Sequence, residues 1–183
     1  RADAPSRGEL VTGFLRAGDG TQADLVRLAE RGSACNPYNV LASDGLELGV
    51  HESTTGELRV LPPGIYALSN HLLDTPWPKV RQAKSRLAEA LGDLPRNGPL
   101  LDLLRDTETA ADEELPRTGV SLEFERMLSS AFIRGERYGT RCSTVITCNR
   151  DGEVAFSEWS WAADGELSGL ARFGYTIGEA GVA

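Results

Sequence analysis

A polar cluster follows a short apolar run in residues 61–80, LPPGIYALSNHLLDTPWPKV. The run IYAL leads directly into Ser69, Asn70 and His71. Loops that leave a strand often carry binding and catalytic groups. The amide of Asn70 donates hydrogen bonds at any pH, which suits it to stabilising an oxyanion or holding a carbonyl-bearing ligand. This cluster is therefore the candidate site, although asparagine is equally suited to a turn.

The two histidines of the chain differ in context. His71 belongs to the polar cluster, where it either contacts a ligand or caps backbone groups of its own loop. His51 stands beside Glu52 in an expected strand, and we expect it at the surface or at a sheet edge. Two histidines offer little for a catalytic triad or a metal site, and the sequence contains no H-E-x-x-H, no G-x-S-x-G and no Gly-rich phosphate loop. We predict no metal site.

Arg141 enters an expected strand in the stretch YGTRCST, among small and apolar neighbours. Its guanidinium is expected to meet either a structural carboxylate or an anionic ligand. Trp77 and other aromatic residues can line an apolar pocket, although a place in the core is more common: Tyr66, Tyr138, Trp159 and Trp161. The candidate ligand-binding residues are Ser69, Asn70, His71, Trp77 and Arg141.

The charge balance limits the partners. The chain has 183 residues, 27 of them acidic and 19 basic, with a net charge of -8. Such a chain lacks the positive surface that nucleic acids or anionic membranes require. No apolar run approaches the roughly 18 residues of a membrane span, and RADAPSRGEL has no apolar signal region. We expect a soluble, cytoplasmic protein that forms a single domain over residues 1–183.

The three cysteines, Cys35, Cys142 and Cys148, include no C-x-x-C pair. An odd number without this spacing argues against a disulfide framework and a zinc site. If Cys142 and Cys148 share a strand, they lie on one face about 20 Å apart and cannot bridge each other. Buried free thiols are expected.

The order of periodic segments predicts an α+β domain with mainly antiparallel sheets. Helix signals with capping residues mark two early helices and a later one behind Pro76 and Pro78, with Thr75 as its N-cap. The expected helices cover residues 7–16, 21–32, 75–91, 99–106 and 122–131. The expected strands cover residues 38–43, 46–52, 58–62, 65–70, 131–133, 140–148, 153–161 and 169–177. Residues 106–119 read as an acidic loop.

Four blocks of the sequence resemble the NRDE family, whose animal members are called transport and Golgi organisation 2 homologues. The blocks are APSRGELVTGFL, YNVLASD, PPGIYALSNHLLDTPWPKVRQAK and YGTRCSTVITCNRDGEVAFSEWSW. They follow the family order from Ala4 to about Trp161. The Asn-Arg-Asp-Glu motif that names the family is expected upstream of Arg1, so the resemblance implies a member whose first strands lie outside this sequence. The stretch Asn149-Arg150-Asp151 is followed by Gly152 and reads as a turn.

The resemblance implies a layered α/β/β/α sandwich like that of the N-terminal-nucleophile hydrolases. In that fold Asn70 is similar in position to an oxyanion-holding asparagine, and Arg141 is a weaker match to an arginine that supports a cysteine nucleophile. Arg1 cannot act as that nucleophile, and Cys35 is internal. As given, the chain is not expected to be a hydrolase; the alternative is a cysteine-dependent amide hydrolase whose nucleophile lies upstream.

The resemblance also implies a non-enzymatic role in intracellular haem trafficking, with haem or another amphipathic metabolite as cargo. No axial-ligand motif is present, so a haem contact would fall to His51, His71 or a cysteine. A weak site suits a carrier that must release its cargo. Strand edges left open by absent strands imply a homodimer. A scaffold protein without a small ligand is the third interpretation.

Overall fold

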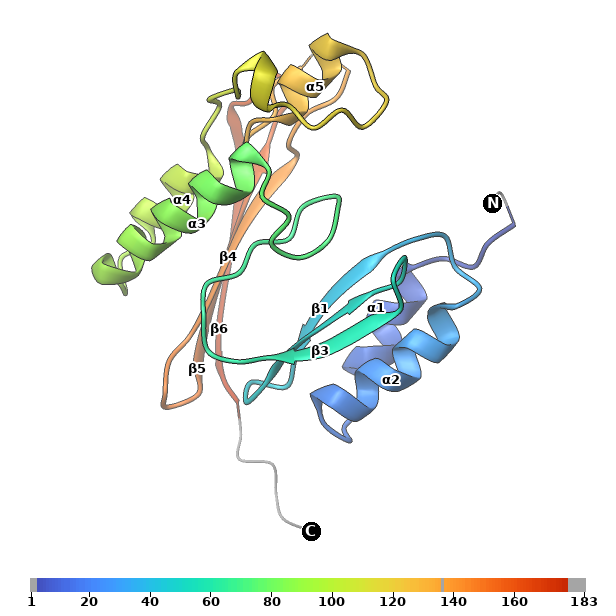
Figure 1. Ribbon diagram of the computed structural model, residues 1–183. Coiled ribbons are helices and arrows are strands. Elements are labelled where there is room, and N and C mark those ends of the chain that lie inside the picture. The colour runs from blue at the N-terminus through green and yellow to red at the C-terminus, as the bar shows by residue number, and fades with distance from the viewer. Residues whose placement is uncertain (1–2, 136, 178–183) are drawn as a thin grey trace. The chain divides into compact units, whose positions relative to one another are not determined.

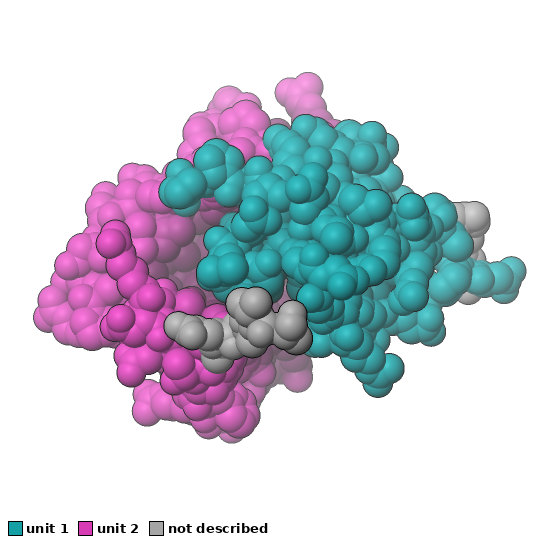
Figure 2. All heavy atoms as spheres, turned by 90° about the horizontal axis from the view of Figure 1, so that it is seen from below, with its two compact units in different colours: residues 1–64 teal, residues 65–183 magenta. Residues whose placement is uncertain are grey.

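The computed structural model describes residues 3–135 and 137–177 and divides into two compact units, Arg1–Gly64 and Ile65–Ala183 (Figure 1; Figure 2). Each unit contains one antiparallel three-stranded sheet with helices. This confirms the expected mixture of helices and antiparallel sheets. The α/β/β/α layering concerns the relation between the two sheets and stays a prediction. No helix among the described residues is long and apolar enough to cross a membrane.

Unit 1 begins with the two predicted early helices. Its elements are α1 (Gly8–Leu15), α2 (Thr21–Gly32), β1 (Asn39–Ser43), β2 (Leu48–Glu52) and β3 (Glu57–Leu61). The strands pair in the order β1-β2-β3. A Cβ at Gly49 of β2 would lie 2.3 Å from Leu25 Cδ1 of α2, so only glycine lets the helix approach the sheet this closely. A small core of Leu10, Leu28 and their neighbours joins the two helices.

A reciprocal pair of hydrogen bonds ties the start of α2 to the turn after β1. Thr21 N donates to Asp44 Oδ2 over 3.1 Å, and Asp44 N donates to Thr21 Oγ1 over 3.0 Å. Asp44 Oδ1 accepts from the amides of Leu46 and Glu47 as well. These bonds lower the pKa of Asp44 from 3.8 to about 2, with the Glu47 amide as the largest cause. The residue before the helix, Gly20, provides no side-chain cap, so Asp44 supplies it from another element.

The prediction that His51 lies at the surface or at an edge is wrong. His51 is on the central strand β2 and is 4% exposed. Its Nδ1 lies 3.1 Å from the carbonyl oxygen of Glu57, and its ring meets Tyr38 edge to face at 5.5 Å. His51 shares a face of β2 with Gly49, against which α2 packs, so its side chain is shielded by contacts that a five-residue strand pattern does not reveal.

Unit 2 places helices on one face of the second sheet. Its helices are α3 (Pro78–Ala90), the 3-10 turn η1 (Leu91–Asp93), α4 (Gly98–Leu104), the 3-10 turn η2 (Asp112–Glu114) and α5 (Leu122–Leu128). Its strands are β4 (Cys142–Cys148), β5 (Glu153–Trp161) and β6 (Leu167–Thr176), paired in that order. The expected strands over residues 140–148, 153–161 and 169–177 are confirmed. Residues 106–119 form the expected loop apart from η2.

The core of unit 2 lies between the sheet and the pair α3 and α4 (Figure 1). Trp159 and Trp161 are buried there with Phe132, whose ring meets Trp161 edge to face at 5.2 Å. Trp161 Nε1 donates to Ser143 Oγ over 3.1 Å, which satisfies the buried indole. Both tryptophans therefore belong to the core, the more common place for such aromatic residues.

Two expected strands of unit 2 are absent. Residues 65–70 form no strand because Ala67 N donates to Asp74 Oδ1 over 2.9 Å, and Asp74 N donates to the Ala67 carbonyl over 2.8 Å. This local loop takes the backbone groups that a sheet would have paired. Residues 131–133 likewise form no strand, since Phe132 N donates to the Asp106 carbonyl over 2.7 Å.

Thr75 is not the N-cap of α3. The helix begins at Pro78, with Trp77 in the N-cap position and no side-chain cap. Thr75 Oγ1 instead donates to the Leu72 carbonyl over 2.8 Å. Of the two prolines only Pro78 occupies the first turn, where its missing N–H costs nothing.

The expectation that the free thiols are buried is confirmed for one of the three cysteines. Cys35 is buried, whereas Cys142 and Cys148 are free and exposed. The helices cover the face of β4 that carries Ser143 and Val145, so the alternate residues face away. The expectation of buried thiols was wrong for this strand.

Candidate ligand-binding site

A cavity of about 150 Å³ in unit 2 brings part of the predicted site together. Its walls come from the loop before α3, the first turn of α3, the segment before α5 and the end of α5. The lining residues are Asn70, Trp77, Pro78, Lys79, Pro116, Thr118, Glu125, Leu128 and Ser129. One amide, one aromatic ring, one cation and one carboxylate thus surround a small space.

The start of α3 positions the aromatic and the cationic wall. Trp77 has an extended backbone at the N-cap, and the ring of Pro78 restricts the backbone of the first helical turn. Lys79 follows in this turn. The Lys79 ammonium lies 5.8 Å from the centroid of the Trp77 ring. An ammonium over an indole face is attracted by the ring quadrupole, more strongly where water is excluded.

Lys79 is the cation among the residues that line the cavity, and the pKa of its ammonium is lowered. Its Nζ donates to the Leu128 carbonyl over 2.8 Å, and burial lowers the pKa of its ammonium. Among the described residues no carboxylate forms an ion pair with it. A half-buried ammonium without a counter-ion is a site for an anionic group.

Glu125 of α5 lines the same cavity. This carboxylate is 6% exposed and accepts from both the amide and the hydroxyl of Thr118, each over 2.6 Å. It therefore fixes the segment that ends at Gly119. The helix α5 begins at Leu122, and its N-cap Ser121 accepts a hydrogen bond from the Phe124 amide. Glu125 is committed to this segment by both hydrogen bonds.

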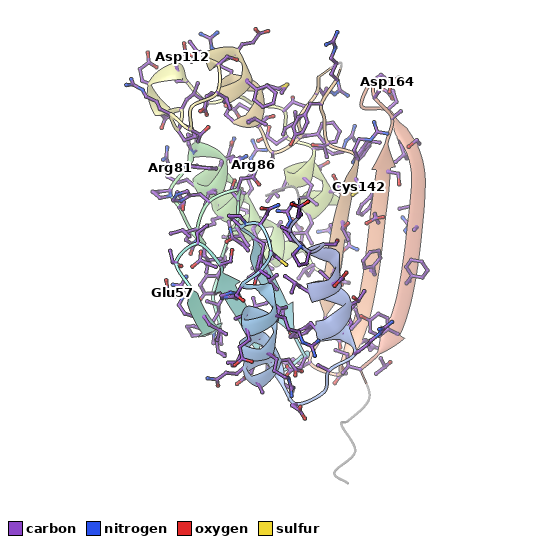
Figure 3. All side chains as sticks on the ribbon, turned by 90° about the vertical axis from the view of Figure 1, so that its right-hand side faces the viewer. Glu57, Arg81, Arg86, Asp112, Cys142 and Asp164 are labelled. Atoms are coloured by element: carbon purple, nitrogen blue, oxygen red, sulfur yellow. The ribbon has the colours of Figure 1, made fainter. Side chains whose placement is uncertain are left out.

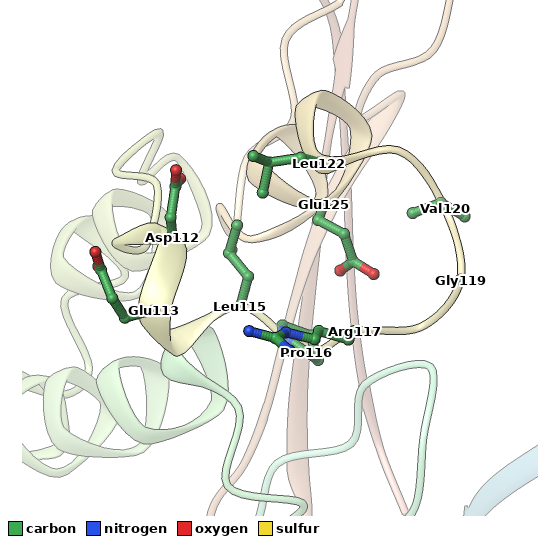
Figure 4. Close-up of a pocket in the computed structure, with 9 residues that line it drawn as sticks. All are labelled: Asp112, Glu113, Leu115, Pro116, Arg117, Gly119, Val120, Leu122 and Glu125. Carbon is green, nitrogen blue, oxygen red and sulfur yellow. The ribbon is translucent and has the colours of Figure 1, made fainter.

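A larger cavity of about 480 Å³ adjoins the same segment (Figure 4). It shares Pro116 and Glu125 with the first cavity. Asp112 at its edge pairs with Arg126 through two hydrogen bonds of 2.6 and 2.5 Å, which lower the pKa of Asp112. This cavity provides room next to the first one.

The structure distributes the predicted residues unevenly. Asn70 and Trp77 line the 150 Å³ cavity. His71 is exposed, with Nδ1 2.8 Å from Thr75 Oγ1 and its ring 5.7 Å from that of Trp77. Ser69 is half-buried and lines none of the cavities described here.

Arg141 lines a different cavity, so the structure does not bring it to Asn70. Sequence reasoning missed Lys79 and Glu125. A signal for Lys79 was available, because it is one of only two lysines and follows Trp77-Pro78 directly. Glu125 stands in LEFERML, where nothing distinguishes it from a surface carboxylate.

Residues 1–163 match the sequence model of the family described as Transport and Golgi organisation 2. This range contains every residue that lines the 150 Å³ cavity. The chain belongs to the Transport and Golgi organisation 2 family. The resemblance seen in the sequence blocks is thereby confirmed.

Three relatives show how much of a family member the chain represents. The Transport and Golgi organization protein 2 homolog of Bos taurus is 35% identical over 175 residues, covering 86% of this chain and 63% of the relative. The homolog of Mus musculus is 31% identical over 177 residues, covering 86% and 63%. That of Homo sapiens is 33% identical over 172 residues, covering 86% and 62%. The chain therefore spans less than two thirds of the length of these Transport and Golgi organisation 2 relatives.

Proposed function

We propose that this chain is a non-enzymatic ligand-handling protein that takes part in haem trafficking. The proposed site is the cavity of Asn70, Trp77 and Lys79. The observation that carries the proposal is the half-buried Lys79 ammonium, which has no carboxylate partner among the described residues and lies beside an indole ring. A cation, an amide donor and an aromatic face together suit an amphipathic molecule with an acidic group.

Haem has this chemistry, because an apolar macrocycle carries two propionates. In the proposed complex a propionate meets Lys79 and accepts from the Asn70 amide, and the macrocycle edge packs on Trp77. The cavity of about 150 Å³ is smaller than the roughly 300 Å³ at which ligand pockets begin, so it takes one end of the molecule. The neighbouring space of about 480 Å³ gives the rest a place along the wall of Pro116.

The donor set supports a cargo that can be released. No histidine, cysteine or methionine is among the residues that line the cavity. Binding then rests on one charge-assisted contact and aromatic packing rather than on an iron bond, and each of these contributes a few kcal/mol at most. Such a site binds reversibly, as handing a ligand to a second protein requires.

The hydrolase alternative is less well supported. It needs Asn70 and Arg141 at one catalytic centre, and they line separate cavities. None of the three cysteines lines the cavity of Asn70. We therefore prefer ligand binding to amide hydrolysis.

Titration of the purified protein with haemin, followed by the Soret band, tests the proposal. A saturable shift is expected for the parent chain, with about tenfold weaker binding for Lys79→Gln and a smaller loss for Asn70→Ala. Arg150→Gln removes an exposed cation from the turn between β4 and β5 and is the matched charge control. An unsaturable shift, or equal affinity in Lys79→Gln and Arg150→Gln, would reject the haem site.

A further inference from the structure

A cavity of about 250 Å³ lies where β4 begins and where β5 turns into β6. Its walls come from residues 133–135, 137–141, 162–163 and 165 of unit 2. The guanidinium-bearing residues Arg134, Arg137 and Arg141 all line it. These segments are joined at the sheet, where Trp161 N donates to the Arg141 carbonyl over 2.8 Å.

The charge around this cavity is opposite to that of the chain. The nine residues 133–141, IRGERYGTR, hold three arginines and one glutamate, a balance of +2 in a chain of -8. Six other arginines of the described residues pair with carboxylates: Arg27, Arg59, Arg81, Arg86, Arg96 and Arg126. None of the described ion pairs involves an arginine of the cavity. Several guanidinium groups that have no ion pair within residues 3–135 and 137–177 attract anions.

Arg134 is held in place by uncharged neighbours. Its guanidinium carbon lies 5.9 Å from the centroid of the Phe132 ring. On the other side a Cβ at Gly165 would lie 2.7 Å from Arg134 Nε, so only glycine leaves space for the side chain. Gly165 also has a φ of +82°, which glycine adopts without strain. Among the described residues, the contacts that position the guanidinium of Arg134 are therefore with an aromatic ring and a glycine.

The acidic residue nearest in this turn is occupied within the turn itself. Asp164 lies in the connection between β5 and β6 (Figure 3), and its Oδ1 accepts from the Glu166 amide over 3.0 Å. No ion pair joins it to an arginine among the described residues. The other residues that line the cavity carry no charge: Ile133, Gly135, Tyr138, Gly139, Thr140, Ala162, Ala163 and Gly165.

We propose that the cavity of Arg134, Arg137 and Arg141 binds a phosphate group, either a free phosphate ester or the headgroup of an anionic lipid. Planar guanidinium groups match tetrahedral oxyanions through paired hydrogen bonds, and several of them favour a dianion over a single carboxylate. A volume of about 250 Å³ is below that of a whole drug-sized ligand and suits a phosphate with its first attached atoms.

This site is independent of the proposed haem function. The arginine cavity and the cavity of Asn70 have no lining residue in common. A chain that fails to bind haem can still bind phosphate here, and the reverse also holds.

Isothermal titration with sodium pyrophosphate tests the proposal on the full chain. We expect saturable one-to-one binding that Arg137→Gln and Arg141→Gln each weaken about tenfold, and that Arg150→Gln leaves unchanged. Gly165→Val introduces a side chain where the Arg134 guanidinium lies and is expected to weaken binding as well. Circular dichroism of each variant shows whether the fold is retained.

Vesicles of phosphatidylcholine with and without phosphatidic acid separate the two sources of the phosphate group. Binding to pyrophosphate alone assigns the site to a soluble ester, and additional capture by the phosphatidic acid vesicles assigns it to a lipid headgroup. Absence of pyrophosphate binding, or an equal loss in Arg141→Gln and Arg150→Gln, overturns the proposal, because the effect would then be absent or due to total charge.

Discussion

The two units use buried charge in different ways. In unit 1 the fully buried Glu52 forms a 2.9 Å ion pair with Arg59, and Asp24 pairs with Arg27 along α2. In unit 2 the half-buried ammonium of Lys79 meets only a backbone carbonyl and an aromatic ring. The exposed arginines of the 250 Å³ cavity, Arg134, Arg137 and Arg141, also have no carboxylate partner among the described residues. The buried carboxylates Glu52 and Asp24 of unit 1 are thus paired, whereas the cations at these two cavities of unit 2 have no carboxylate partner among the described residues, although other charges of unit 2 are paired.

This difference indicates which charges maintain the fold and which can bind a ligand. Removing one partner of a buried ion pair strongly destabilises the fold. The remaining charge has lost its partner, and the removed side chain leaves a cavity. A charge without a partner contributes little to folding, and its natural counter-ion is a ligand. Variants in the two units should therefore separate stability from binding.

The largest effect is expected for Glu52→Ala in β2. The substitution removes a carboxylate that is 1% exposed, leaves a cavity and takes the buried partner from Arg59. We expect a loss of about 3 kcal/mol in the free energy of unfolding. Urea unfolding followed by far-ultraviolet circular dichroism measures it, since all three tryptophans lie in unit 2 and would not report on unit 1 directly.

Glu57→Gln provides a matched control for that experiment. Glu57 pairs with the same arginine at 3.2 Å, but its side chain is 49% exposed. A change of no more than about 0.5 kcal/mol is expected, because solvent screens exposed pairs. Equal losses in the two variants would contradict the distinction between buried and exposed charge in unit 1.

A smaller effect is expected for Asp44→Ala, which removes the cap that the turn supplies to α2. The loss should be about 1 kcal/mol at neutral pH. The folded pKa of about 2 is below the unfolded value of 3.8, so this stabilisation is complete above about pH 4 and disappears as the pH falls through 2. Thermal unfolding of parent and variant across this range should converge at low pH. A constant difference would mean that the charge of Asp44 is not involved.

The sequence predicted the elements whose signals are local. The helices α1 and α2 and the hairpin of β4 and β5 were found because glycine turns and apolar periodicity agree within short windows, although the N-cap positions of both helices provide no side-chain cap. Residues 65–70 have the composition of a strand but not its partner, since Asp74 takes the backbone groups of Ala67. Whether an extended run joins a sheet depends on such contacts, and composition does not contain them.

The site was predicted in part for the same reason. Asn70 and Trp77 lie in one continuous segment, and both line the cavity. Glu125 lines it from α5, 48 residues after Trp77, and Arg141 lines another cavity. Segments that are distant in the chain meet only in the folded unit, so sequence spacing could supply one wall of the site and not the other.

Lys79→Met tests the available charge of the first cavity. Loss of the hydrogen bond to the Leu128 carbonyl is offset by relief from burying an unpaired ammonium, so the free energy of unfolding should change by less than about 1 kcal/mol. Burial lowers the pKa of Lys79 below 10.5, so the unfolded chain binds more protons in the interval up to that value. Stability therefore rises with pH in that interval for the parent, and Lys79→Met should lack this rise. Urea unfolding at a series of alkaline pH values measures it. A loss above about 2 kcal/mol would instead make Lys79 a structural residue.

The smallest effect on stability is expected for Arg137→Gln and Arg141→Gln. Both residues are exposed at the 250 Å³ cavity, and neither forms an ion pair within the described part of the chain. The free energy of unfolding should therefore change by no more than about 0.5 kcal/mol. Tryptophan fluorescence during urea unfolding is the suitable measurement, because Trp159 and Trp161 lie in the core of the same unit. A gain in stability is the expected sign, since removing one of three neighbouring cations lowers their repulsion. A clear loss of stability would show that these arginines support the fold. The contrast between the paired buried carboxylates of unit 1 and the cations that line the cavities of unit 2 would then fail at this cavity.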